Sequence, residues 1–166
     1  MILIFQDVIE VDKVSTTQIS LRLGGDLPSS EELTQTLGIK PTKFVRRGER
    51  VSKKRVQPVD LWILELAEFD TDSTEEERDS QMLQVAITLQ KISSNLAILD
   101  RTNCNADLYI STIREEDQGG LTLPPELVAA TASAGLSIQI SILVMLDDYL
   151  EPEPGSSLST TMVVDS

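Results

Sequence analysis

Basic side chains are concentrated in one short stretch of this chain. Eight of the fourteen basic residues lie between positions 40 and 55, where only Glu49 opposes them. The rest of the chain carries six basic and twenty-six acidic residues, so the net charge of −13 conceals a segment of +7. An arginine guanidinium is a planar fork that binds phosphate or carboxylate groups through two hydrogen bonds. The chemistry that this segment offers is therefore the binding of anions.

We expect the basic stretch to form a hairpin-like loop that grips an acidic protein surface or a phosphate. Its candidate partner- or anion-binding residues are Lys43, Arg46, Arg47, Arg50, Lys53, Lys54, Arg55 and, on the strand that follows, Trp62. An alternative is that the loop folds back on the acidic surface of its own chain as a solvated charge network. A nucleic-acid ligand is not expected, because the acidic remainder of the chain repels a polyanion.

Histidine is absent from the chain, and this absence excludes several classes of enzyme. Ser-His-Asp and Cys-His nucleophile arrangements, and nearly all ordinary zinc sites, need it. Neither a phosphate-binding GxxxxGK[ST] loop nor a GxGxxG pattern is present. The acidic run 115–117 lacks the spacing of a calcium loop. We therefore predict a protein that is not an enzyme and that needs no metal or cofactor.

Cysteine content and hydropathy indicate a cytoplasmic protein. The single cysteine, Cys104, cannot form an internal disulfide, which is typical of a reducing compartment. The apolar start at Met1–Phe5 is too short for a signal peptide, and no stretch approaches the roughly 20 apolar residues that span a bilayer. We expect no membrane association, and the oligomeric state stays open.

Alternation of apolar and polar residues predicts four strands, at 18–23, 59–66, 106–113 and 137–145. The strand at 59–66 is apolar on both faces, which is typical of a central strand. Residues 2–11 are a candidate for an additional edge strand.

Three helices are predicted between these strands. The first begins after Ser29, which has the capping-box spacing with Glu32, and ends at Gly38. The second is a long amphipathic helix of about six turns, which begins at a second capping box, Thr74 with Glu77. The third begins at 124–125, where two prolines fit the first turn, and ends at Gly135.

The order of these elements predicts an α+β fold. We expect a single four- to five-stranded, largely antiparallel sheet with two to three helices packed on one face. Residues 1–150 would form one domain, and residues 151–166, rich in Glu, Pro, Ser and Thr, a disordered tail. Strand order does not follow from these patterns.

Several runs of residues resemble those of one bacterial family. The run LGIKPTKFVRRGE, the single Trp62, the run ADLYIS and the run GGLTLPPELVAATASAGLSIQISI resemble a domain of unknown function, number 4279, over about residues 16–145. The resemblance implies an α+β fold in a bacterial cytoplasm and offers no catalytic residue to transfer. In size and composition the family is similar to immunity proteins, which neutralise a neighbouring toxin.

We therefore expect a non-catalytic protein-interaction module. One form of it is a cytoplasmic immunity protein that covers a basic toxin or effector with its acidic surface, while the basic loop sets specificity. The alternative is a regulatory domain that binds a phosphate or nucleotide ligand through Arg46, Arg47 and Arg50.

Overall fold

A computed structural model describes residues 15–70, 72–115 and 119–145 of the chain. The expected strand at 2–11 and the expected tail at 151–166 lie outside these residues. The elements, in chain order, are β1 (Thr16–Gly25), α1 (Ser30–Leu37), β2 (Lys43–Val45), β3 (Arg50–Ser52), β4 (Arg55–Val56), β5 (Asp60–Asp70), α2 (Glu75–Leu96), β6 (Cys104–Arg114), α3 (Pro125–Ser133) and β7 (Ser137–Val144).

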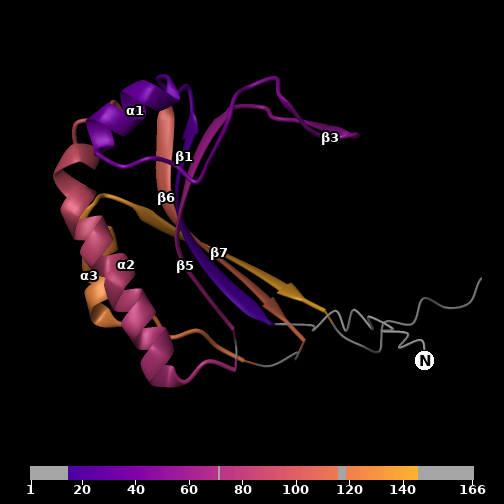
Figure 1. The fold of residues 1–166 in the computed structure, drawn as a ribbon, viewed down its shortest axis with the longest axis vertical. Helices are drawn as coiled ribbons and strands as arrows, with labels where there is room; N and C mark the ends of the chain where they lie inside the picture. The colour runs from indigo at the N-terminus through magenta and orange to yellow at the C-terminus, as the bar shows by residue number, and fades with distance from the viewer. Residues whose placement is uncertain (1–14, 71, 116–118, 146–166) are drawn as a thin grey trace, which may run out of the picture.

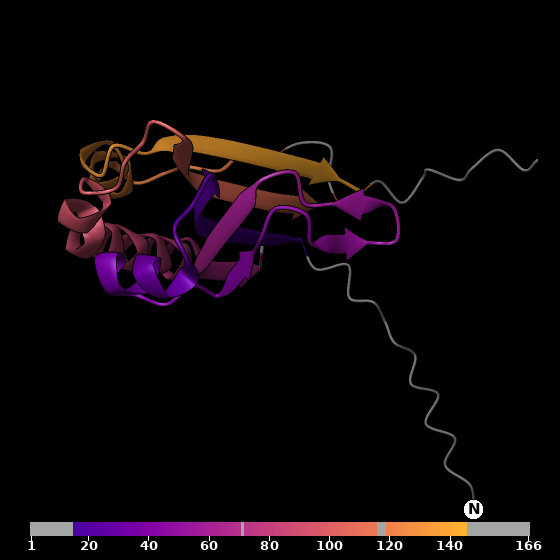
Figure 2. The ribbon, with the colours of Figure 1, turned by 90° about the horizontal axis from the view of Figure 1, so that it is seen from above.

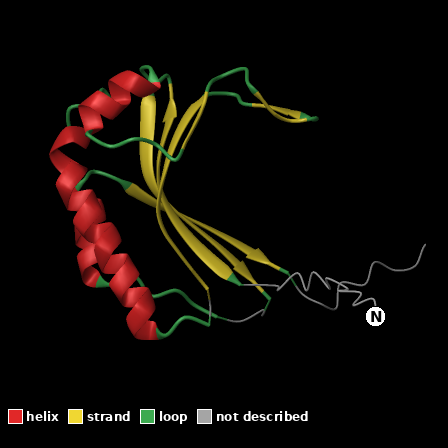
Figure 3. Ribbon diagram, viewed as in Figure 1, coloured by secondary structure: helices red, strands yellow, loops and turns green. Residues whose placement is uncertain are grey.

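Five of the strands form one twisted sheet in the order β2-β5-β1-β6-β7 (Figure 1). All neighbours in it are antiparallel except β6 and β7, which are parallel. The three helices form a single layer on one side of the sheet (Figure 3). The predicted α+β fold, with its largely antiparallel sheet and helices on one face, is confirmed.

The core lies between the sheet and the helices. In the central strand β1, every second side chain points into it, and Ile19, Leu21 and Leu23 are fully buried. The apolar stripe of α2 packs against them through residues such as Met82 and Leu89. Side chains alternate across a strand and recur every 3.6 residues on a helix, so one face of the sheet and one stripe of the helix are buried together.

Local sequence signals set the ends of two helices. The Ser29 hydroxyl accepts a hydrogen bond from the backbone N–H of Glu32, and Gly38 ends α1 in the left-handed region at φ 73°. Thr74 and Glu77 bond reciprocally at the start of α2, which completes a capping box. Ser29 is therefore confirmed as the N-cap of α1 through one of the two capping-box bonds, and the predicted capping box at Thr74 and Glu77 is confirmed in full.

The short strands β3 and β4 pair only with each other and form a separate two-stranded ribbon. We call residues 46–57 the arm. It leaves the sheet between β2 and β5 and projects to the side away from the helices (Figure 2). No helix in the described part of the chain is long and apolar enough to cross a membrane.

Candidate functional site

The arm contains six of the eight basic residues of the 40–55 segment. Its two sides are joined close to the sheet, where Gly48 N–H donates to the Gln57 carbonyl (2.9 Å) and Gln57 N–H donates to the Glu49 carbonyl (2.8 Å). Beyond them, Arg50 pairs with Val56 and Ser52 with Arg55. The predicted hairpin therefore exists, and it presents its basic residues in two groups with different surroundings.

The first group lies at the base of the arm and is bound to the body of the protein. One oxygen of the Asp60 carboxylate accepts from the Arg47 backbone N–H (2.9 Å). The other accepts from the Leu27 N–H (3.1 Å) and from Arg46 Nη1 (3.1 Å). Asp60 is the first residue of β5, so this carboxylate links the arm, β5 and the segment after β1.

These contacts lower the pKa of Asp60. The Arg47 backbone N–H contributes most, partial burial opposes it, and the Leu27 N–H and the nearby Arg46 cation add to the lowering. Hydrogen bonds and a positive charge favour the ionised carboxylate.

Arg46 and Arg47 are therefore partly occupied within the chain itself. Arg46 also donates to the Leu27 carbonyl (3.1 Å) and lies over the Phe44 ring, 4.7 Å from its centroid. Arg47 forms an ion pair with Asp26, and both side chains are more than half exposed. An exposed pair of this kind contributes only about 0–1 kcal/mol. These two arginines therefore pair with acidic residues of their own chain, as the alternative interpretation of the basic segment predicted.

The second group lies at the tip of the arm. Arg50 Nη1 donates to the Lys53 carbonyl (3.1 Å), a contact that closes the turn. Lys53, Lys54 and Arg55 are exposed and form no ion pair with another described residue. Val51 and Val56 are also exposed on this ribbon. The tip thus combines free cations with apolar side chains, away from the acidic body.

The other two predicted site residues lie apart from the tip. Lys43 is exposed on the edge strand β2, where it pairs with Ile63 of β5. Trp62 is fully buried in the core on the helix side of the sheet, so its ring is not available to a ligand at the arm. Its Nε1 has no hydrogen-bond partner within the described part of the chain.

A family model described as a domain of unknown function, DUF4279, matches residues 15–145. The chain belongs to this family. No curated protein and no solved structure matches it. The DUF4279 match spans the whole sheet, the three helices and the arm.

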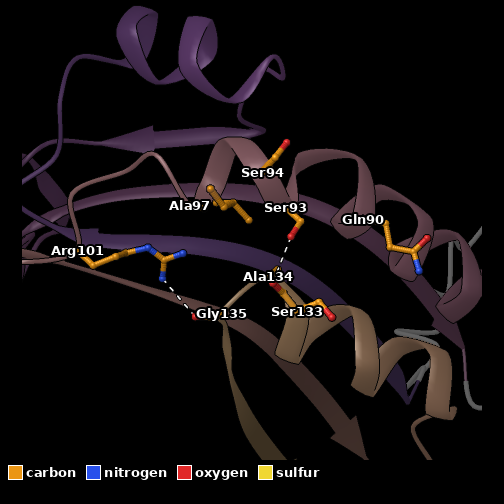
Figure 4. A pocket seen from close by; sticks show the side chains of 9 residues that line it. Gln90, Ser93, Ser94, Ala97, Arg101, Ser133, Ala134 and Gly135 are labelled. Atoms are coloured by element: carbon orange, nitrogen blue, oxygen red, sulfur yellow. Dashed lines mark hydrogen bonds between the residues drawn. The ribbon is translucent and has the colours of Figure 1, made fainter.

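A shallow polar pocket of this DUF4279 chain lies where the C-terminal ends of α2 and α3 meet, and sequence reasoning did not find it. Ser93 Oγ donates to the Ser133 carbonyl (3.3 Å), and Arg101 Nη1 donates to the Gly135 carbonyl (3.4 Å) (Figure 4). A cation near helix C-termini is stabilised by their carbonyls. The polar groups of this pocket thus join two helix ends, and we assign them a structural role.

A polar network on the sheet face opposite the helices was also missed. Arg22 donates to both carboxylate oxygens of Asp107 (3.0 Å each) and to Gln139 Oε1 (2.9 Å), and it lies 3.7 Å from the centroid of the Tyr109 ring. The network crosses β1, β6 and β7. Arg22 was visible in the sequence as a polar residue alternating with core leucines, but its partners lie 85 or more residues away.

The chemistry that the described arm offers is positive charge and hydrogen-bond donors for an anionic group. Within the described ranges, no group of three or more His, Cys, Asp or Glu side chains could hold a metal ion. Cys104 is buried, and burial raises the pKa of its thiol, which keeps it protonated at neutral pH. The exposed cations of the arm remain the best candidate for a functional surface.

Proposed function

We propose that this domain is a non-catalytic protein-interaction module that inserts the tip of its arm against an acidic surface of a protein partner. The observation that carries the proposal is the separation of the two basic groups. The base of the arm is tied to Asp60 and Asp26, whereas Lys53, Lys54 and Arg55 at the tip are exposed and form no ion pair with a described residue.

The composition of the tip supports a protein partner. Cations alone would serve any polyanion, but Val51 and Val56 on the same ribbon add exposed apolar area. Protein interfaces combine an apolar centre with arginine and a polar rim. Charge complementarity at the tip would speed association and favour the correct partner.

A phosphate or nucleotide ligand is less well supported. Its expected donors were Arg46, Arg47 and Arg50. Arg46 and Arg47 each already contact a carboxylate of the chain, and Arg50 Nη1 donates to the Lys53 carbonyl. A phosphate would have to displace Asp60 or Asp26. The remaining tip cations lie on a projecting ribbon, whereas small-ligand sites are concave and enclose their ligand.

The immunity-protein form of the proposal adds a second contact, to a basic toxin. Its support is the exposed acidic cluster at the first turn of α2, formed by Glu75, Glu76, Glu77 and Asp79. The −20 charge of the chain outside the 40–55 segment would attract a cationic protein. Co-expression with a toxin encoded beside the gene would test this form, with survival of the cells as the readout.

Affinity capture from the native cytoplasm tests the module itself. The wild type is compared with a tip variant, Lys53→Ser, Lys54→Ser and Arg55→Ser. A control variant, Lys40→Ser, Arg78→Ser and Lys91→Ser, changes the net charge equally but leaves the arm intact. We expect a stoichiometric partner with the wild type and the control but not with the tip variant.

Other outcomes of this capture would contradict the proposal. If the wild type, the tip variant and the control captured the partner equally, the partner would bind a surface other than the tip. Absence of any partner, together with a thermal shift on addition of inorganic phosphate or nucleotides, would favour the ligand-binding alternative. A ligand at 100 times its dissociation constant stabilises a protein by about 2.7 kcal/mol, which such a screen detects.

A further inference from the structure

The outer edge of β7 has no partner strand among the described residues. This strand is the last of the sheet, and in the described part of the chain it pairs only with β6. Its register runs unbroken over eight pairs, from Ser137 opposite Asp107 to Val144 opposite Arg114. Natural edge strands are usually blunted by charges, proline, bulges or short length. Residues 137–145 contain no charged residue and no proline.

Apolar side chains on both faces of β7 are exposed. Ile138 packs against the core, so Ile140, Ile142 and Val144 share the helix-side face, and Ile142 is 61% exposed. Leu143, 55% exposed, points to the opposite face. Whatever covers this edge must therefore offer apolar side chains on both of its own faces.

The hydrogen-bonding groups of the edge can be assigned from the pairing with β6. Met145 N–H donates to the Arg114 carbonyl (2.6 Å), which places the backbone groups of Met145 on the β6 side. Successive residues of a strand alternate, and in a parallel pair both groups of one residue point the same way. The N–H groups of Ile140, Ile142 and Val144 therefore point outward.

The segment that precedes β1 enters the sheet at this same end. Thr17 lies opposite Thr112 of β6, and Thr112 lies opposite Ile142 of β7. Strands are about 4.8 Å apart, so a position beyond β7 is roughly 14 Å from β1. About five extended residues, at roughly 3.3 Å each, cover that distance. Residues 11–15 are enough for the crossing.

We propose that residues 2–10 of the same chain bind along the outer edge of β7 as an additional strand. A segment that leads into β1 from this end runs opposite to β1, and so parallel to β6 and β7. Ile2, Ile4 and Val8 alternate with Leu3, Phe5 and Ile9. Such a strand would carry three large apolar side chains on each face, with Gln6 and Glu10 on one face and Asp7 on the other.

A second copy of the chain is the competing occupant, and tethering disfavours it. A short flexible tether gives an effective concentration in the millimolar range, well above the micromolar concentration of a typical free protein. Two copies, each with a net charge of −13, also repel one another. The N-terminal segment of the same chain therefore has the advantage in dilute solution.

Hydrogen exchange at the amides of Ile140, Ile142 and Val144 in the full chain, at two protein concentrations, tests this assignment. The test variant carries Ile4→Pro and Ile9→Pro. Proline has no backbone N–H, so one even-numbered and one odd-numbered residue lose their donor, and pairing is disrupted whichever set of amides faces β7. A matched control carries Leu158→Pro and Val163→Pro near the other end of the chain. We expect at least tenfold faster exchange in the test variant only. The amides of Leu21 and Leu108 should stay protected.

A second variant, Leu3→Asp with Phe5→Asp, keeps every backbone donor and should give the same selective acceleration. Equal exchange at the three amides in the wild type and the test variant would overturn the proposal. Faster exchange in the Leu158 and Val163 control would assign the edge to the C-terminal residues instead. Loss of protection on dilution of the wild type would assign it to a second copy.

Discussion

Arg46 and Asp60 meet at the base of the arm, with Arg46 Nη1 3.1 Å from Asp60 Oδ2. The side chain of Asp60 is only 13% exposed, and the same carboxylate accepts the backbone N–H of Arg47. One acidic residue at the start of β5 therefore holds the base of the arm. These contacts fix the point where the arm leaves the sheet, while Lys53, Lys54 and Arg55 at its tip are exposed.

Replacing Asp60 with Asn should lower the free energy of unfolding by about 1–2 kcal/mol. Hydrogen bonds to a charged acceptor are stronger than those to a neutral one, and three donors meet this carboxylate. Urea denaturation measures the change. Asp72→Asn removes the same charge from an exposed position and serves as the control. Equal stability of the two variants would show that Asp60 does not hold the arm.

The contribution of Asp60 should depend on pH in a defined direction. Because its pKa is lowered in the folded protein, the stabilisation is complete above the pKa of the unfolded-state carboxyl, about 3.9. It is lost as the pH falls through the folded-state pKa. The difference in unfolding free energy between the wild type and Asp60→Asn should therefore be constant near neutrality and shrink below about pH 4. A difference that grows on acidification would contradict the assignment.

Local patterns in the sequence predicted most of the secondary structure. Ser29 with Gly38 and Thr74 with Glu77 set helix ends through contacts within a few residues, so the sequence alone identifies them. The strand at 59–66 was expected to be central, and β5 does lie between β2 and β1. Its continuation to Asp70 was not expected, because the residues after 66 are mostly acidic or polar; the strand continues past a register shift opposite Ile19 and Ser20.

The candidate site was only partly predictable, for a physical reason. The concentration of cations and the hairpin followed from composition and spacing. Which arginines are paired depends on Asp26 and Asp60, whose positions are set by the pairing of β1 with β5. Trp62 was placed on the correct strand, but the face that it occupies depends on which side the helices cover.

Replacing Gly25 with Ala should destabilise the fold strongly. Gly25 ends β1 at φ 128°, and a Cβ there would lie 2.2 Å from the Asn103 carbonyl oxygen. Both the backbone conformation and the contact with neighbouring backbone exclude a side chain. We expect a loss of at least about 2 kcal/mol, seen as a lower melting temperature.

Gly120→Ala is the matched control for this experiment, because a Cβ at that position meets no described atom within 4 Å. It should change the melting temperature little. If Gly25→Ala were tolerated equally well, the close approach of β1 to Asn103 would be wrong.

Fluorescence of the single tryptophan should report the core rather than the arm. Trp62 is fully buried among apolar side chains, so its emission should lie at shorter wavelength than that of free tryptophan and resist quenching by acrylamide. Unfolding in urea should abolish both properties. The tip variant of Lys53, Lys54 and Arg55 should leave the spectrum unchanged. If acrylamide readily quenched Trp62 in the folded protein, the ring would be accessible and could contact a partner.

The Arg22 and Asp107 side chains should be energetically coupled. They bond through two parallel hydrogen bonds, and both are largely buried, with 22% and 18% of their side-chain surface exposed. Paired groups in one network show coupling energies of about 0.5–3 kcal/mol. A double-mutant cycle with Arg22→Ala and Asp107→Ala, followed by urea denaturation, should give at least about 1 kcal/mol.

Arg22→Lys separates the charge of Arg22 from its shape. Lysine keeps the positive charge but cannot form the two-bond contact with Asp107 or stack as a plane on the Tyr109 ring. If geometry stabilises the network, Arg22→Lys should lose most of the stability that Arg22→Ala loses. If lysine restored full stability, the attraction would be that of a simple ion pair, and the network would not depend on the register between β1 and β6 that places Arg22 opposite Asp107.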